Sequence, residues 1–431
     1  RNYNGGTMKD FDKYIDWMYK RDEKKGKHTL KNIQKLLEAF DNPQDKIKVI
    51  HVAGTNGKGS TCNFLSNTIS KTSKVGLFIS PFMECMTESI TINGVKISEE
   101  DFVKYIEMFK PVLEKLDAEG YKNTYFEVLT AIMYKYFYDQ NVDIAIVEVG
   151  MGGTLDSTNI VKKPIASVIV TISMDHVGIL GNTIEEIAMN KAGIIKEGAP
   201  VFLYPKDEHL YKLFKDVADS KHAPLYTFTK DEVKVLETSD HENDFDFRNY
   251  KNMRTSLVGV HQFYNAALAI TVLDYFKDMF HLNKEIIKEG IFTSHNTGRL
   301  ELISKSPKIL VDGSHNKEAM DALVDSIKVF KYNHLILVFS ILKDKDYEYA
   351  IKELSKITDK FIITTIDNPE RAFKLYDLEK EVKKVRDDVV AIADRVEAIN
   401  YATTIAEADD LILVCGSLYL VRDVIKFVKN K

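Results

Sequence analysis

One stretch of the chain decides the fold of its first half: His51-Val52-Ala53-Gly54-Thr55-Asn56-Gly57-Lys58-Gly59-Ser60. The residues that lead into its glycines, 47–52, are mostly apolar and β-branched, which predicts a buried strand. The residues that follow its glycines, 60–70, place an apolar stripe on one helical face, made of Phe64, Leu65, Thr68 and Ile69. The sequence therefore predicts a strand, a glycine-rich loop over 54–59 and a helix in direct succession.

This loop has the chemistry of a phosphate-binding site. Its glycines let backbone N–H groups converge on phosphate oxygens, and the start of the following helix favours negative charge. Lys58 neutralises the phosphates, and Ser60 supplies the hydroxyl for Mg²⁺, because Gly59 occupies the position where Ser or Thr usually follows the lysine. The alternative is a glycine-rich turn without a ligand. We predict ATP as the ligand, with contacts from Thr55, Asn56, Gly57, Lys58, Gly59 and Ser60.

Short β-branched runs alternate with helical patterns along the rest of the first half, at residues 75–79, 144–149, 166–172 and 201–203. This alternation predicts an α/β fold with a mostly parallel sheet. Residues 233–257 are polar and alternating, which indicates a small antiparallel excursion. A second series begins at 308–311 and continues at 334–339, 360–364, 389–393 and 411–415, which predicts a separate Rossmann-like α/β domain.

The domain boundary is expected near residue 296, where a helical stretch gives way to the turn formers Ser294-His295-Asn296-Thr297-Gly298. The prediction is an ATP-binding domain over residues 1–296 and a C-terminal Rossmann-like domain over residues 297–431. A chain of 431 residues with 45% hydrophobic content is long enough to bury more than one core.

Composition argues against several functional classes. The net charge is −5 with the signs interspersed, so no basic block is available for nucleic acid. Cys62, Cys85 and Cys415 stand far apart without a CxxC pair, which argues against a disulfide framework or a zinc site. No apolar run approaches the roughly 18 residues of a membrane span. We therefore expect a cytoplasmic enzyme without a nucleic-acid or membrane partner.

Polar residues at strand ends are the next candidates, because ligands of open α/β sheets gather beyond the carboxyl ends of the strands. Glu148 ends the run 144–148 and is either an Mg²⁺ ligand or a structural acid paired with a lysine. His176 follows the strand 168–172, where a lone histidine is more often a turn residue than a ligand. Ser80-Pro81 closes the strand 75–79, and by itself indicates only a turn.

Lys191 interrupts an apolar stripe on a predicted helix. Thr183 and Glu186 are expected to form a capping box, and the helix after it carries Ile184, Ile187, Ala188 and Lys191 on one face. One interpretation is that the stem of Lys191 packs while its ammonium reaches solvent. The other is a functional lysine, because a desolvated amine has a lowered pKa and is more reactive.

The loop resembles the signature of the folylpolyglutamate synthase/dihydrofolate synthase family, a branch of the Mur ligase superfamily. Ser80-Pro81, the motif from Glu148 to Asn159, Asp175-His176 and Lys191 to Ile194 resemble further family motifs. The resemblance implies that Ser60 holds one Mg²⁺, and that a second is held by Ser80, Glu148, His176 and a carbamylated Lys191. Lys58, His176 and carbamylated Lys191 would then be the catalytic residues, with K⁺ as a further cofactor.

The second half carries matches to the same family. Asn265, Arg299 and Asp312 correspond to the family's nucleotide contacts, although Arg299 and Asp312 could each form a structural ion pair. His315 and Ser417 are the candidates for glutamate binding. The chain departs from the family pattern at residues 26–32 and 82–89, in the region that binds pterin, which leaves the use of dihydropteroate open.

The implied reaction is ATP-dependent addition of L-glutamate to tetrahydrofolate or another folate through an acyl phosphate, by a monomeric enzyme. Dihydrofolate synthase activity is a further option. One alternative is a Mur-like amino-acid ligase acting on another carboxylate acceptor. A second is a P-loop regulatory ATP-binding protein that ligates nothing, against which two α/β domains and a series of strand-end ligands argue.

Overall fold

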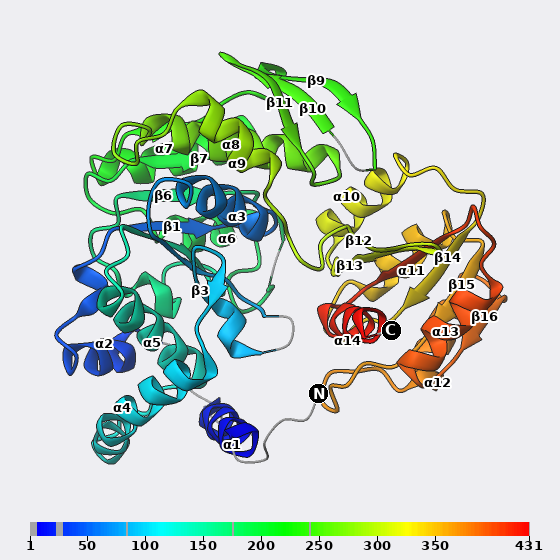
Figure 1. The fold of residues 1–431 in the computed structure, drawn as a ribbon, viewed down its shortest axis with the longest axis horizontal. Helices are drawn as coiled ribbons and strands as arrows, with labels where there is room; N and C mark the ends of the chain where they lie inside the picture. The colour runs from blue at the N-terminus through cyan, green and yellow to red at the C-terminus, as the bar shows by residue number, and fades with distance from the viewer. Residues whose placement is uncertain (1–6, 23–28, 83–84, 175, 241–242, 431) are drawn as a thin grey trace. The chain divides into compact units, whose positions relative to one another are not determined.

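The computed structural model describes residues 7–22, 29–82, 85–174, 176–240 and 243–430 (Figure 1). The described residues form two compact units, one from residues 1–233 and 264–294, the other from 234–263 and 295–431. The polar segment 234–263 therefore belongs to the second compact unit, together with residues 295–431. The division into functional domains at residue 296 remains a prediction. Within the described chain, no helix has the length and apolarity to cross a membrane.

The first unit is built on a sheet in the order β4-β3-β2-β5-β1-β6-β7-β8. The neighbouring strands β2, β5, β1, β6, β7 and β8 are parallel to one another. The strand β3 is antiparallel to β2, and β4 is antiparallel to β3. Their bounds are β1 Val49–Ala53, β2 Val75–Phe78, β3 Ile90–Ile92, β4 Val95–Lys96, β5 Ile144–Glu148, β6 Ala166–Ile169, β7 Val201–Leu203 and β8 Leu225–Tyr226. The predicted parallel sheet is confirmed. The sequence missed the short edge strands β4 and β8 and the short strand β3 beside β4.

Helices cover both faces of this sheet. Side chains alternate along β1, so Val49 and Ala53 share one face of the strand. Val49 packs in a core with residues of α5, and Ala53 packs in a core with residues of α6. The helix α3 packs on β1, β2 and β5 (Figure 1). The helices of the first unit are α1 Thr7–Tyr19, α2 Lys31–Glu38, α3 Lys58–Ile69, α4 Glu99–Ala118, α5 Tyr125–Asp139, α6 Ile184–Ala192, α7 Glu208–Ser220 and α9 Lys284–Phe292; α8, Val260–Tyr275, continues into it from residue 264. Short 3₁₀ turns span Lys20–Asp22, Pro43–Asp45, Met86–Ser89, Ser157–Ile160 and Lys230–Glu232.

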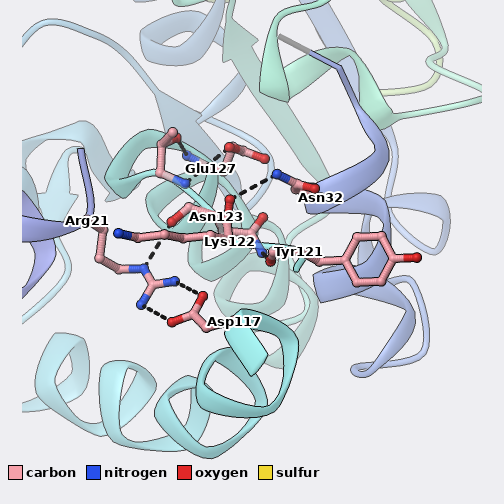
Figure 2. A network of polar contacts seen from close by, with 8 residues as sticks. Arg21, Asn32, Asp117, Tyr121, Lys122, Asn123 and Glu127 are labelled. Carbon is pink, nitrogen blue, oxygen red and sulfur yellow. Dashed lines mark hydrogen bonds and ion pairs between the residues drawn. The ribbon is translucent and has the colours of Figure 1, made fainter. Parts of the chain in front are cut away.

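A polar network fixes the connection between α4 and α5 (Figure 2). The guanidinium of Arg21 donates to both carboxylate oxygens of Asp117, at 2.7 and 3.2 Å, and to the carbonyl oxygen of Asn123 at 3.0 Å. The side-chain nitrogen Nδ2 of Asn32 donates to the backbone carbonyl oxygen of Lys122 at 2.9 Å. Since Arg21 is buried and bidentate, this ion pair holds the end of α4 against the residues that follow α1.

The second unit contains the predicted antiparallel excursion. Its sheet has the order β11-β10-β9, with β9 Val233–Thr238, β10 Asn243–Phe247 and β11 Tyr250–Thr255. Phe245 and Met253 are fully buried, and Phe245 packs edge-on against Phe263, with ring centroids 5.4 Å apart. The expected change from parallel to antiparallel structure at residue 233 is therefore confirmed.

The larger sheet of the second unit has the order β12-β13-β17-β14-β15-β16. The neighbouring strands β13, β17, β14, β15 and β16 are parallel to one another, and β12 is antiparallel to β13. The strands are β12 Glu301–Lys305, β13 Lys308–Asp312, β14 Leu335–Phe339, β15 Lys360–Ile363, β16 Val389–Ala391 and β17 Leu411–Cys415; the helices are α10 Lys317–Ile327, α11 Tyr347–Ser355, α12 Leu375–Lys383, α13 Arg395–Ile405 and α14 Leu418–Lys429. The predicted Rossmann-like unit is confirmed; β12 was not predicted.

Candidate active site

The carboxyl ends of the parallel strands meet at one edge of the first sheet. The register pairs Phe78 of β2 with Val147 of β5, and Val52 of β1 with Glu148 of β5. Because neighbouring parallel strands end together, the sheet brings the chain segments bearing Ser80, Glu148 and the glycine-rich loop side by side. These predicted site residues come from separate parts of the sequence.

Reciprocal hydrogen bonds hold the loop on the segment that follows β6. The amide of Asn56 donates to the hydroxyl of Thr171 at 3.0 Å, and that hydroxyl donates to the carbonyl oxygen of Asn56 at 3.0 Å. The hydroxyl of Thr55 in the same way accepts from Ser173 N at 3.1 Å and donates to Ser173 O at 3.2 Å. The protein's own side chains therefore fix the loop backbone. Sequence reasoning missed Thr171 and Ser173, since contacts this distant leave no local signal.

Gly57 is the point at which the loop turns into α3. It has φ 85°, and an added Cβ would lie 2.7 Å from Oδ1 of Asn265 and 2.9 Å from Cγ1 of Val170. The structure thus brings together the predicted nucleotide contacts Gly57 and Asn265. The ammonium of Lys58 donates to the carbonyl oxygen of Gly54 at 2.9 Å, and Ser60 is buried in the first turn of α3.

Glu148 ends β5 as a buried carboxylate, 5% exposed. Its charge acts on Cys62 of α3, whose thiol pKa is raised first by burial and then by Glu148, while Lys58 opposes the shift. The carboxylate of Glu148 is therefore within electrostatic reach of the helix that begins at the phosphate loop. Cys62 is a further neighbour of the site that the sequence did not indicate.

Lys191 of α6 is fully buried, with 0% of its side chain exposed. The interpretation in which its ammonium reaches solvent is therefore wrong. The turn after Glu148 lies directly on α6, because a Cβ added at Gly153 would be 3.0 Å from Cα of Lys191 and 2.6 Å from the carbonyl oxygen of Asn190. The fold thus brings the segment of Glu148 against the helix of Lys191.

The predicted capping box before α6 is only half formed. The hydroxyl of Thr183 accepts from the amide of Glu186 at 3.2 Å, as expected. The carboxylate of Glu186, however, accepts from the amide of Asn182 at 2.6 Å instead of returning to Thr183. The chain before the helix turns so that the preceding amide is the nearer donor, and the helix start is satisfied by a variant of the motif.

His176 lies on an exposed loop in a left-handed conformation, with φ 45°. This loop reaches the glycine turn, since Cδ2 of Leu180 would be 2.7 Å from a Cβ added at Gly152. Asp175, the other residue of the motif, lies outside the described residues. Within the described part of the chain, no group of three or more His, Cys, Asp or Glu is arranged to hold a metal ion. The predicted ligand set combines Glu148 and His176 with a serine and a modified lysine, and so contains only two residues of those types.

A buried polar network connects β1 to the turn after Glu148. Nε2 of His51 lies 2.7 Å from the hydroxyl of Thr158, which itself donates to the carboxylate of Asp156. The hydroxyl proton is thus used, so His51 must donate through Nε2–H. Asp156 also accepts from the amide of Met151 at 2.9 Å. Burial, and then the charge of Lys196, lower the pKa of His51 to about 3.

We expect His51 to make folding stability depend on pH. The unfolded chain takes up a proton near the ordinary pKa of about 6.5, but the folded protein does so only near 3, so the contribution of His51 is complete above 6.5 and is lost as the pH falls. We measure the free energy of unfolding by urea titration at several pH values between 6.5 and 4.5. In His51→Gln, this free energy should change with pH less steeply than in the wild type, by about 1.4 kcal/mol per pH unit. His222→Gln, which changes an exposed histidine, is the control. An unchanged slope in His51→Gln would contradict the assignment.

The predicted residues of the second unit gather at the ends of β13 and β17. The register pairs Asp312 with Cys415, so the residues after both strands are neighbours. Nδ1 of His315 donates to the carbonyl oxygen of Gly313 at 3.0 Å. The hydroxyl of Ser417 accepts from the amide of Tyr419 at 3.2 Å and caps α14.

Asp312 already accepts hydrogen bonds on both carboxylate oxygens. Oδ2 accepts from the amide of Leu300 at 2.9 Å, and Oδ1 accepts from the amide of Ser314 at 2.8 Å. Arg299 lies beside this turn, with a terminal nitrogen 3.5 Å from a Cβ added at Gly313. Asp312 therefore has a structural role in the turn, whatever else it binds.

A phosphate loop at the strand-end edge of one α/β unit, followed by a Rossmann-like α/β unit, defines a P-loop nucleotide-binding protein. Residues 52–273 match the Mur ligase middle domain, and residues 298–418 match the Mur ligase, glutamate ligase domain. The chain is 34% identical to the dihydrofolate synthase/folylpolyglutamate synthase of Bacillus subtilis, over 96% of this chain and 98% of the relative.

Solved structures agree. The crystal structure of folylpolyglutamate synthase from Thermotoga maritima is 35% identical, with TM-score 0.86 and coverage of 98% of both chains. A complex of a folylpolyglutamate synthase with AMPPCP and folate is 28% identical, with TM-score 0.83 over 97% of this chain and 99% of that one. The chain therefore belongs to the folylpolyglutamate synthase/dihydrofolate synthase family of Mur-type ligases, and the resemblance expected from the sequence is confirmed.

Proposed function

We propose that this chain joins L-glutamate to a folate carboxylate with ATP, through an acyl phosphate. The observation that carries the proposal is the phosphate loop fixed beside the strand ends of Ser80 and Glu148, in a chain of this ligase family. Folate carboxylate attacks the γ-phosphorus of ATP and releases ADP. The amine of glutamate then attacks the acyl carbon, a proton leaves the nitrogen, and phosphate departs.

The nucleotide contacts follow from the loop. The backbone amides from Gly57 to Ser60 would bind the β- and γ-phosphates, because those of Thr55 and Asn56 donate to Thr171 and fix the loop. Lys58 would leave the carbonyl of Gly54 to neutralise the charge of the phosphates. Asn265 approaches the loop at Gly57. Arg299 and Asp312 are assigned to the nucleotide by resemblance to the family.

The residues at the strand-end edge fit Mg²⁺. Ser60 and Glu148 are both buried oxygen donors, the hard ligands that Mg²⁺ prefers. Ser60 would hold one ion; Ser80, Glu148, His176 and a carbamylated Lys191 would hold the second. Carbamylation would make the buried Lys191 an anion, which gives a reason for a lysine in an apolar stripe. When bound, the ions neutralise charge on the phosphates and on the acyl phosphate.

His315 and Ser417 are the proposed glutamate contacts. Both lie at the strand-end edge of the second unit, where ligands of open α/β sheets bind. K⁺ as a cofactor and a monomeric state remain predictions from the family resemblance, and a cytoplasmic location remains a prediction from the composition.

Pterin preference is the open part of the proposal. Residues 26–28 and 83–84 of the departing segments lie outside the described residues. Asn32 anchors the first segment to Lys122, and Ser89 of the second accepts from the amide of Ile79 at the end of β2.

ADP release tests the function directly. We expect steady-state release only when ATP, tetrahydrofolate and glutamate are all present, because the acyl phosphate forms only on the folate carboxylate and is consumed only by the amine of glutamate. Equal release without glutamate or without folate would refute the proposal and favour a regulatory ATPase. Dihydropteroate in place of tetrahydrofolate then separates the options: ADP release identifies a bifunctional enzyme, and its absence limits the chain to folylpolyglutamate synthesis.

A further inference from the structure

Lys206 lies directly beyond β7, at the same sheet edge as the phosphate loop. Its ammonium donates to the carbonyl oxygen of Val170 at 2.6 Å and to that of Tyr204 at 3.0 Å. The ammonium also lies 5.0 Å from the centroid of the Tyr204 ring. The side chain is half-buried. A charged donor shared between two backbone carbonyls ties the chain after β7 to the chain after β6.

Val170 is the residue on which the phosphate loop rests. Its Cβ would be 3.0 Å from a Cβ added at Gly54, and its Cγ1 would be 2.9 Å from one added at Gly57. The amide of Val170 donates to the carbonyl oxygen of Ala53 at 2.8 Å. The next residue, Thr171, holds Asn56 by reciprocal hydrogen bonds. A displacement of Val170 would therefore reach both glycines of the loop.

We propose that Lys206 is a positioning residue for the phosphate loop, acting through the segment from Val170 to Ser173. The proposal rests on the proposed function, in which the loop binds the phosphates of ATP. Preorganised amides bind phosphate without the cost of ordering the loop, so a less firmly held segment weakens nucleotide binding. Lys206 itself needs no contact with the nucleotide.

The test is ADP binding to the full chain, measured by calorimetry, for Lys206→Met and Lys206→Arg. The methionine keeps a stem of similar length without the donors, and we expect the Kd for ADP to rise about tenfold. The arginine retains donors and should recover most of the affinity. KM for ATP should rise with the Kd, whereas KM for folate and glutamate should stay within about twofold. Lys212→Met removes an exposed lysine of α7 and should change nothing.

A double-mutant cycle distinguishes this role from a general effect on stability. Thr171→Val removes the hydroxyl that holds Asn56, and its effect on the Kd for ADP should be less than additive with that of Lys206→Met. Additive effects, an unchanged Kd in Lys206→Met, or equal rises in all three KM values would each overturn the proposal. If Lys206→Met does not fold, Lys206→Ala, which also removes the ammonium donors, completes the same cycle with Thr171→Val. Failure of the wild-type chain to bind ADP would instead refute the proposed function.

Discussion

Replacement of Lys191 by alanine is expected to reduce ligase turnover by a factor on the order of a hundred or more, with partial recovery in acetate or formate. Lys191 is fully buried on α6, against the turn that follows Glu148. If its amine is carbamylated, the variant loses an anionic ligand of the second Mg²⁺. A small carboxylate can enter the space that the side chain leaves and supply an oxygen in its place. Steady-state ADP release with and without the added carboxylate measures both effects.

Two controls separate this chemistry from a loss of packing. Met189→Ala changes a half-exposed side chain of the same helix and should keep wild-type turnover. Lys191→Met keeps most of the buried volume without an amine, and it should stay inactive in acetate because no space is opened. The carbamate can also be observed by ¹³C NMR of protein equilibrated with labelled bicarbonate. Turnover at the wild-type rate in Lys191→Ala would contradict the carbamate hypothesis.

Replacement of Gly57 by alanine is expected to weaken nucleotide binding about a hundredfold and to destabilise the first unit by about 1–3 kcal/mol. The added Cβ would meet Oδ1 of Asn265 at 2.7 Å and Cγ1 of Val170 at 2.9 Å, in a backbone with φ 85°. The clash displaces the loop from Val170, and the left-handed conformation is unfavourable for alanine. ADP titration and urea unfolding give the two quantities.

Gly94→Ala is the matched control for Gly57→Ala. Gly94 has a similar φ of 80°, but an added Cβ there would meet nothing within 4 Å. The control variant therefore carries the backbone strain without the clash, and it should lose stability while binding ADP normally. Equal ADP affinities in the Gly57 and Gly94 variants would contradict the role of the close approach at Gly57.

The fold was predictable where the signal was local. The buried strands 49–53, 144–148 and 411–415 each show as an apolar run in the sequence, and α3 shows as an apolar stripe after the glycines. The missed strands β4, β8 and β12 are edge strands that are short or half-exposed, and β3 is a three-residue strand next to an edge. Their sequences alternate too briefly to be distinguished from loops, and only pairing with a neighbour makes them strands.

The sequence alone determined the parts that depend on neighbouring residues: the strand, loop and helix around Gly54–Ser60, the succession of α/β elements, and a lysine in the apolar stripe of α6. Tertiary structure alone decided that Lys191 is buried without reaching solvent, that Asn265 meets Gly57, and that Lys206 holds the carbonyl of Val170. The physical reason is that periodicity and turn chemistry act within a few residues of the chain. Close approaches between distant segments depend on strand order, register and side-chain packing, which are fixed only when the whole unit folds.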